Sequence, residues 1–125
     1  MKKTLWLSAV LVTFTFYYSC TKDKTQKPVA TTCSGVDSAS NTYNLRIKGI
    51  MDNNCAMGGC HDAASANSLV ILDTYAATKN SFQTKTCLCA MKQDGSCLPM
   101  PQGADKLADS LITYIQCWTE NGYPQ

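Results

Sequence analysis

The chain has one histidine, His61, among its 125 residues. Any chemistry that requires an imidazole must therefore use that residue. The sequence also lacks an excess of one charge. Without Lys2 and Lys3 the eleven Lys and Arg residues fall to nine, which equals the nine Asp and Glu residues. A chain without a basic stripe is poorly suited to nucleic acid, so we expect no nucleic-acid partner.

The sequence has no apolar run long enough for a permanent transmembrane helix. The stretch from Leu5 to Tyr18 has 14 residues, whereas a spanning helix needs about 20. Two lysines precede it and Ser19-Cys20 follows it, as in an export signal. The pattern resembles the lipobox of bacterial lipoproteins, in which the cysteine is acylated. We expect residues 1–20 to be a lipoprotein signal peptide, with lipidation of Cys20 anchoring the protein to a membrane in the periplasm or at the cell surface. The alternative is an ordinary secretory signal with an incidental cysteine.

Residues 21–42 are rich in Thr, Ser, Lys and Ala and have no apolar periodicity, which predicts a flexible tether. The compact domain is then expected at residues 43–125. A domain of this size buries little apolar surface, and such domains often depend on disulfides, a metal or a cofactor for stability.

Three helices are predicted in this domain, which makes the fold class all-α. They cover about residues 43–53, about 72–80 with Asp73 as a cap, and a segment with Asp109 as N-cap that stops at Gly122. A long cysteine-rich segment, 81–107, separates the last two helices and is predicted to be irregular. Loops of this length in small domains are usually functional.

The segment CAMGGCH, from Cys55 to His61, carries the strongest chemical signal. Two cysteines followed directly by a histidine are typical of covalent haem attachment. The thiols add to the two vinyl groups of haem, and the imidazole becomes a ligand of the iron. The common spacer has two residues and this one has four, but Gly58 and Gly59 allow a tight fold that can absorb the difference. The motif predicts one heme c held by Cys55, Cys60 and His61.

A second iron ligand is expected downstream, and Met100 is the first candidate. A thioether is a good sixth ligand, and Pro101 holds the chain extended beside it. Met91 is the rival, and a lysine, water or an open position are the other possibilities. Met57 lies inside the attachment segment and Met51 on a predicted helix face, so neither is favoured.

The order of helix, Cys-x4-Cys-His, short helix, Met-Pro loop and a last helix with Trp118 and Gly122 resembles class I monohaem cytochrome c domains. The likeness is to the bacterial variety with this longer spacer, found in exported lipoproteins, and covers about residues 43–123. It implies an electron carrier rather than an enzyme, with redox proteins as weakly bound partners. It also implies that the first and last helices pack together. The residues expected at that contact are Ile47, Ile50 or Met51, and on the last helix Ile115 and Trp118.

Three other interpretations remain open at this point. The first is a disulfide-stapled surface module without haem, in which Cys55 and Cys60 form a disulfide. The second is a zinc site that Cys87 and Cys89 complete. The third is a haem enzyme or sensor with an open distal position.

Five cysteines remain after Cys20, Cys55 and Cys60 are assigned, so one of the five should be unpaired. They are Cys33, Cys87, Cys89, Cys97 and Cys117. Because Cys33 lies in the predicted tether, we expect it to be the unpaired one. A Cys97–Cys117 bridge is preferred, since it would hold the Met100 loop against the last helix.

Overall fold

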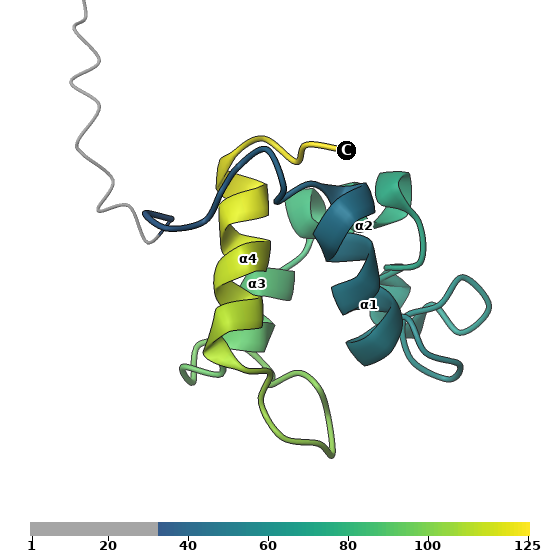
Figure 1. The fold of residues 1–125 in the computed structure, drawn as a ribbon. Helices are drawn as coiled ribbons and strands as arrows, with labels where there is room; N and C mark the ends of the chain where they lie inside the picture. Colours follow the sequence, from purple (N-terminus) through teal and green to yellow (C-terminus); the bar gives the residue numbers. More distant parts are fainter. Residues whose placement is uncertain (1–32) are drawn as a thin grey trace, which may run out of the picture.

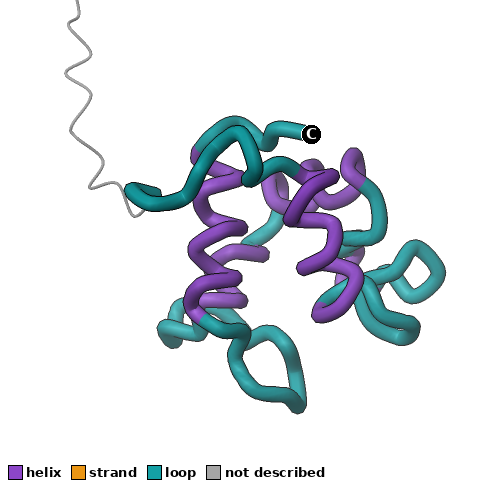
Figure 2. The backbone as a smooth tube through the Cα atoms, in the orientation of Figure 1, coloured by secondary structure: helices purple, strands orange, loops and turns teal. Residues whose placement is uncertain are grey.

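The computed structural model describes residues 33–125, which form a small helical domain (Figure 1). Its α-helices are α1 (Lys48–Asn54), α2 (Tyr75–Thr84), α3 (Cys87–Lys92) and α4 (Asp109–Glu120). A π-helical segment, η1 (Tyr43–Ile47), leads into α1, and a 3-10 turn, η2 (Asn67–Leu69), lies between α1 and α2. The described residues contain no β-strand (Figure 2), so the all-α prediction is confirmed. None of the described helices is long and apolar enough to cross a membrane.

The helix predicted at residues 43–53 is present as η1 followed by α1. The second helix begins later than predicted, because Thr74 rather than Asp73 caps it. The Oγ1 of Thr74 accepts a hydrogen bond from the Ala77 amide at 3.3 Å. The Asp73 carboxylate instead accepts from the amide of Ala63 at 2.9 Å. Asp73, which was expected to cap α2, therefore binds the backbone of the segment that follows His61.

The start of α4 and the segment before it also differ from the prediction. Ala108 occupies the N-cap position, and Asp109 is the first helical residue. A carboxylate in the first turn stabilises a helix through the partial positive charge of its N-terminus. The prediction of an irregular segment at 81–107 was wrong in part, because it contains the end of α2 and the whole of α3.

The C-terminal end of α4 follows the prediction that Gly122 stops the helix. Gly122 has a φ of +81°, which glycine adopts readily. Its amide donates to Thr119 O at 3.2 Å, and the Tyr123 amide donates to Trp118 O at 3.0 Å. These two bonds form a Schellman motif. The rings of Trp118 and Tyr123 pack edge to face with centroids 5.0 Å apart, which is the apolar contact that accompanies this motif.

The hydrophobic core is built around Trp118, which is fully buried. Its ring packs against Tyr43 and Phe82, at centroid distances of 6.0 and 5.8 Å. Its indole N–H donates to the Pro124 carbonyl at 2.8 Å. Ile47 and Ile115 have no exposed surface and belong to the same core. The predicted packing of the first helical segment on the last helix is therefore confirmed, and η1 makes the contact with α4.

A disulfide between Cys33 and Cys117 joins the start of the described chain to α4, with Cα atoms 5.5 Å apart. Beside it the Asn41 side-chain amide, fully buried, donates to Tyr114 O at 2.9 Å. Two expectations were therefore wrong: Cys33 is not the unpaired cysteine, and Cys117 does not pair with Cys97. Because these bonds hold residues 33–42 on the domain, the predicted tether extends too far at its C-terminal end.

The second disulfide joins Cys89 of α3 to Cys97, eight positions later in the chain. It closes a short loop directly before the Met-Pro segment. Three described cysteines are free: Cys55, Cys60 and Cys87. The unpaired cysteine of the predicted five is therefore Cys87, which is buried because α3 packs it inward.

Candidate functional site

The segment from Cys55 to His61 folds into a compact loop at the end of α1. The Cys55 amide donates to Met51 O at 2.8 Å, so this cysteine directly follows the last helical turn. The His61 amide donates back to Cys55 O at 3.1 Å and closes the loop. The four-residue spacer therefore leaves the first cysteine and the histidine joined through their backbones.

Gly59 lets the chain turn inside this loop, with a φ of +85°. Its amide donates to Ser65 Oγ at 2.9 Å, and its carbonyl accepts from the side chain of Asn67 at 2.7 Å. Of the two glycines in the spacer, only Gly59 has a positive φ. A side chain at this position would strain the backbone, which explains why the spacer needs a glycine there.

The imidazole of His61 is oriented by a hydrogen bond to the backbone. Its Nδ1 lies 3.2 Å from the carbonyl oxygen of Val70. Because a carbonyl can only accept, Nδ1 carries the proton, and Nε2 keeps a lone pair for a ligand bond. Histidines that bind metals almost always have their other nitrogen fixed in this way. With Nδ1 bonded in this way, Nε2 is the ring nitrogen that could bind a metal ion.

The segment 70–72, which makes the backbone contacts to His61, is itself held by α2. The Leu72 amide donates to the His61 carbonyl at 2.8 Å. Between Val70 and Leu72, Ile71 exchanges two hydrogen bonds with the hydroxyl of Ser81, at 3.2 Å from its amide and 3.0 Å to its carbonyl. Ser81 is buried in α2. The position of the imidazole is thus set by a helix, through two layers of hydrogen bonds.

A cavity of about 920 Å³ lies beside this loop, and its size is near the upper end for small-molecule sites. Its wall contains Cys55, Cys60 and His61 from one part of the chain, and Met91 and Met100 from another. All four predicted haem residues, together with the rival methionine, therefore surround one cavity. The remaining lining side chains are mostly apolar or uncharged, and Lys85 is the charged residue among the described lining residues.

Two of the free thiols that line this cavity, Cys55 and Cys87, have raised pKa values. Burial, and to a smaller extent the nearby thiols of Cys87 and Cys60, raises the pKa of Cys55 to about 11. Burial also raises the pKa of Cys87. A cysteine that acts as a nucleophile needs a lowered pKa in an electropositive setting. Neither Cys55 nor Cys87 therefore has the lowered pKa that a nucleophilic cysteine needs.

The two methionines come from adjacent parts of the chain. Met91 lies on α3 and is almost fully buried, whereas Met100 is half-buried in the segment after the Cys89–Cys97 loop. The Met100 amide donates to Ala90 O at 3.0 Å, which binds its segment to α3. Both side chains line the cavity, so the structure keeps both as candidate ligands.

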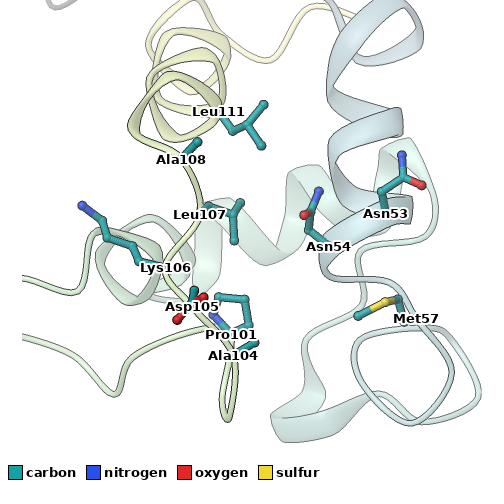
Figure 3. Close-up of a pocket in the computed structure, with 10 residues that line it drawn as sticks. All are labelled: Asn53, Asn54, Met57, Pro101, Ala104, Asp105, Lys106, Leu107, Ala108 and Leu111. Atoms are coloured by element: carbon teal, nitrogen blue, oxygen red, sulfur yellow. The ribbon is translucent and has the colours of Figure 1, made fainter.

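A smaller cavity of about 290 Å³ adjoins the large one (Figure 3). The two share five lining residues: Asn54, Met57, Pro101, Ala104 and Leu107. In Figure 3, Asn54 at the end of α1 lies on the side of that helix toward the chain that leads into α4, and Lys106 points away from it. Met57 at this edge is 46% exposed, so the large cavity reaches the molecular surface here.

Two of the alternative interpretations are not supported by the geometry. Cys89 forms a disulfide with Cys97, so it has no thiolate to offer to zinc. No cluster of three or more His, Cys, Asp or Glu side chains suited to a metal ion occurs among residues 33–125. The disulfide interpretation requires a bond between Cys55 and Cys60, but both of these cysteines are free.

Some features of the site were not predicted. Cys87 places a third free thiol in the cavity wall, and the odd number of cysteines was the only signal of it. The bond between His61 and Val70 joins residues nine positions apart in an irregular segment, which no periodicity reveals. Cys20, the predicted lipidation site, lies outside the described residues. Comparison with known protein families, curated proteins and solved structures finds no match to this chain.

Proposed function

We propose that this protein is a monohaem c-type cytochrome that transfers electrons outside the cytoplasm. The observation that carries the proposal is one cavity lined by three free thiols, two of them from the Cys55–His61 segment, together with an oriented imidazole and two thioethers. Cys55 and Cys60 would form the thioether bonds, and Nε2 of His61 would bind the iron. Met100 would be the sixth ligand, with Met91 as the alternative.

The bound haem supplies a reversible one-electron change at its iron. The chain supplies the environment for that change. His61 is held in one orientation by Val70, so its ring needs little movement when charge changes nearby. The apolar wall limits the access of water, which with the axial ligands sets the reduction potential. The edge near Met57 reaches the surface, where a partner protein can approach through a small transient interface.

The setting of the protein supports this function. Two disulfides are typical of proteins in oxidising compartments. The lysines, apolar stretch and Cys20 at the start of the chain fit an exported lipoprotein. The domain would then be held at a membrane surface by its acyl chains, with the segment before Cys33 as a tether.

Mass spectrometry after labelling tests the covalent attachment. The purified protein is unfolded in denaturant and treated with iodoacetamide, without a reductant. It should take one label within residues 33–125, at Cys87, and should carry the mass of one haem. Cys55 and Cys60 are blocked by thioethers, and the other four described cysteines form disulfides. A Cys87→Ala variant should take no label there. Three labels, or one label without the haem mass, would show that no haem is attached.

Conservative substitution of each methionine tests the sixth ligand. Met100→Leu keeps the apolar volume but removes the sulfur. We expect the reduction potential to fall by on the order of 0.1 V, a fraction of the roughly 0.8 V range that axial ligands cover. The haem should remain attached. Redox titration followed by absorbance measures both properties.

Met91→Leu is the matched control, because Met91 lines the same cavity. It should leave the potential and the low-spin spectrum unchanged. If Met91→Leu lowers the potential and Met100→Leu does not, Met91 is the ligand. If neither variant changes the potential, both methionines are only packing residues and the distal position belongs to another group.

A further inference from the structure

The backbone of Met100 is held on both sides by groups that belong to α3 or follow it. Its amide donates to Ala90 O at 3.0 Å. Its carbonyl accepts from the side-chain amide of Gln93 at 2.9 Å. Gln93 ends α3 with a φ of +52°, a left-handed conformation that turns the chain out of the helix. The two bonds fix both ends of the Met100 residue relative to the cavity wall.

The Cys89–Cys97 disulfide closes the loop that contains Ala90 and Gln93, the two residues that bind the Met100 backbone. Cys89 lies on α3 next to Ala90, and Cys97 is three residues before Met100. Within the closed loop, the Asp94 carboxylate accepts from the Ser96 amide at 3.0 Å. Cys97 also lines the cavity. The disulfide therefore fixes the segment that reaches Met100 at a point close to the site.

We propose that the Cys89–Cys97 disulfide and the Gln93 amide are positioning groups that keep the Met100 sulfur at the distal side of the bound cofactor. This inference rests on the proposed function. Met100 lies in the non-helical segment between α3 and α4, so its backbone position depends on these bonds. Without them the Met100 segment has more conformations, and a smaller fraction of molecules has the sulfur in place.

Carbon monoxide binding to the reduced protein measures that fraction. The apparent affinity for carbon monoxide increases in proportion to the fraction of molecules with an open distal position. We expect a Cys89→Ala/Cys97→Ala variant to bind carbon monoxide at least about tenfold more tightly than the parent protein. Gln93→Glu, which keeps the shape but replaces the amide donor, should show a several-fold increase.

The matched control is Cys33→Ala/Cys117→Ala. Neither of these cysteines lines the cavity, although their disulfide closes a much longer loop. This variant should lose more thermal stability but keep carbon monoxide affinity within about twofold of the parent. An equal increase in both double variants would show a general loosening of the domain and would overturn the proposal.

Amide hydrogen exchange provides a second measurement that does not depend on iron. Exchange at the Met100 amide should be at least about tenfold faster in Cys89→Ala/Cys97→Ala than in the parent, and unchanged in the control. If the parent protein carries no haem, the proposed function fails, but this measurement still tests the positioning role. If the parent carries haem and neither exchange nor carbon monoxide affinity changes, the positioning role fails and the proposed function stands.

Discussion

Replacing His61 with glycine should abolish the low-spin spectrum that the proposed haem gives. His61 is the only imidazole in the chain, so no other histidine can replace it. The thiols of Cys55 and Cys60 would still be present, so haem would remain attached but would lack its proximal ligand. Absorption spectroscopy of the oxidised and reduced protein measures the loss. Added imidazole should enter the space left by the side chain and restore the low-spin spectrum.

The matched control for this experiment is Ser68→Ala, because Ser68 lines the same cavity and is exposed. It should leave the spectrum unchanged. A His61→Gly protein that keeps the parent spectrum without added imidazole would show that the iron uses other ligands. In that case the hydrogen bond from Nδ1 to Val70 would serve only to hold the loop together.

The parts of the fold that depend on local patterns could be predicted from the sequence. The apolar spacing in residues 43–53 and in the last helix, and the glycine at position 122, predict helices that are observed, although Asp109 is the first residue of α4 and not its cap. The start of α2 could not be predicted, because Thr74 and Asp73 are both good caps. A contact with Ala63, distant in the sequence, decides between them by engaging Asp73.

The disulfide pairing also depends on tertiary contacts that the sequence does not reveal. Pairing of Cys33 with Cys117 depends on how residues 33–42 pack on α4, and composition alone made these residues resemble a tether. The polar sequence there hides one decisive contact, the buried side chain of Asn41 bonded to Tyr114. Tertiary contacts of single polar residues leave no periodic pattern, so they cannot be recognised without the fold.

The site was predictable in its residues but not in its support. The spacing from Cys55 to His61 and the Met-Pro pair at 100 identified side chains that surround one cavity. The groups that orient these side chains are mostly backbone carbonyls, such as those of Val70 and Ala90. Because every residue has a carbonyl, the sequence gives no sign of which ones take part.

The Cys33–Cys117 disulfide should contribute more to stability than any other single feature outside the core. It joins residues 84 positions apart and therefore encloses most of the described domain. In the chain-entropy account, a loop of this length is worth about 4–5 kcal/mol, because the bond limits the unfolded chain. Cys33→Ala/Cys117→Ala should lower the free energy of unfolding by about 2–5 kcal/mol. For a domain of this size, that corresponds to a fall in Tm on the order of 10–30 °C.

Thermal and denaturant unfolding measure the loss of stability in the two double variants. Both are compared with the parent protein in the same oxidation state. Cys89→Ala/Cys97→Ala opens a loop of only eight positions, for which the same account gives about 2.5 kcal/mol. The longer bridge should therefore cost more to remove. If the short bridge proves the more costly, its contribution is not loop entropy but native contacts near the cavity, because the unfolded chain gains less freedom from losing it. A loss below about 1 kcal/mol for the long bridge would mean that residues 33–42 are held by the Asn41 bond and its neighbours rather than by the disulfide.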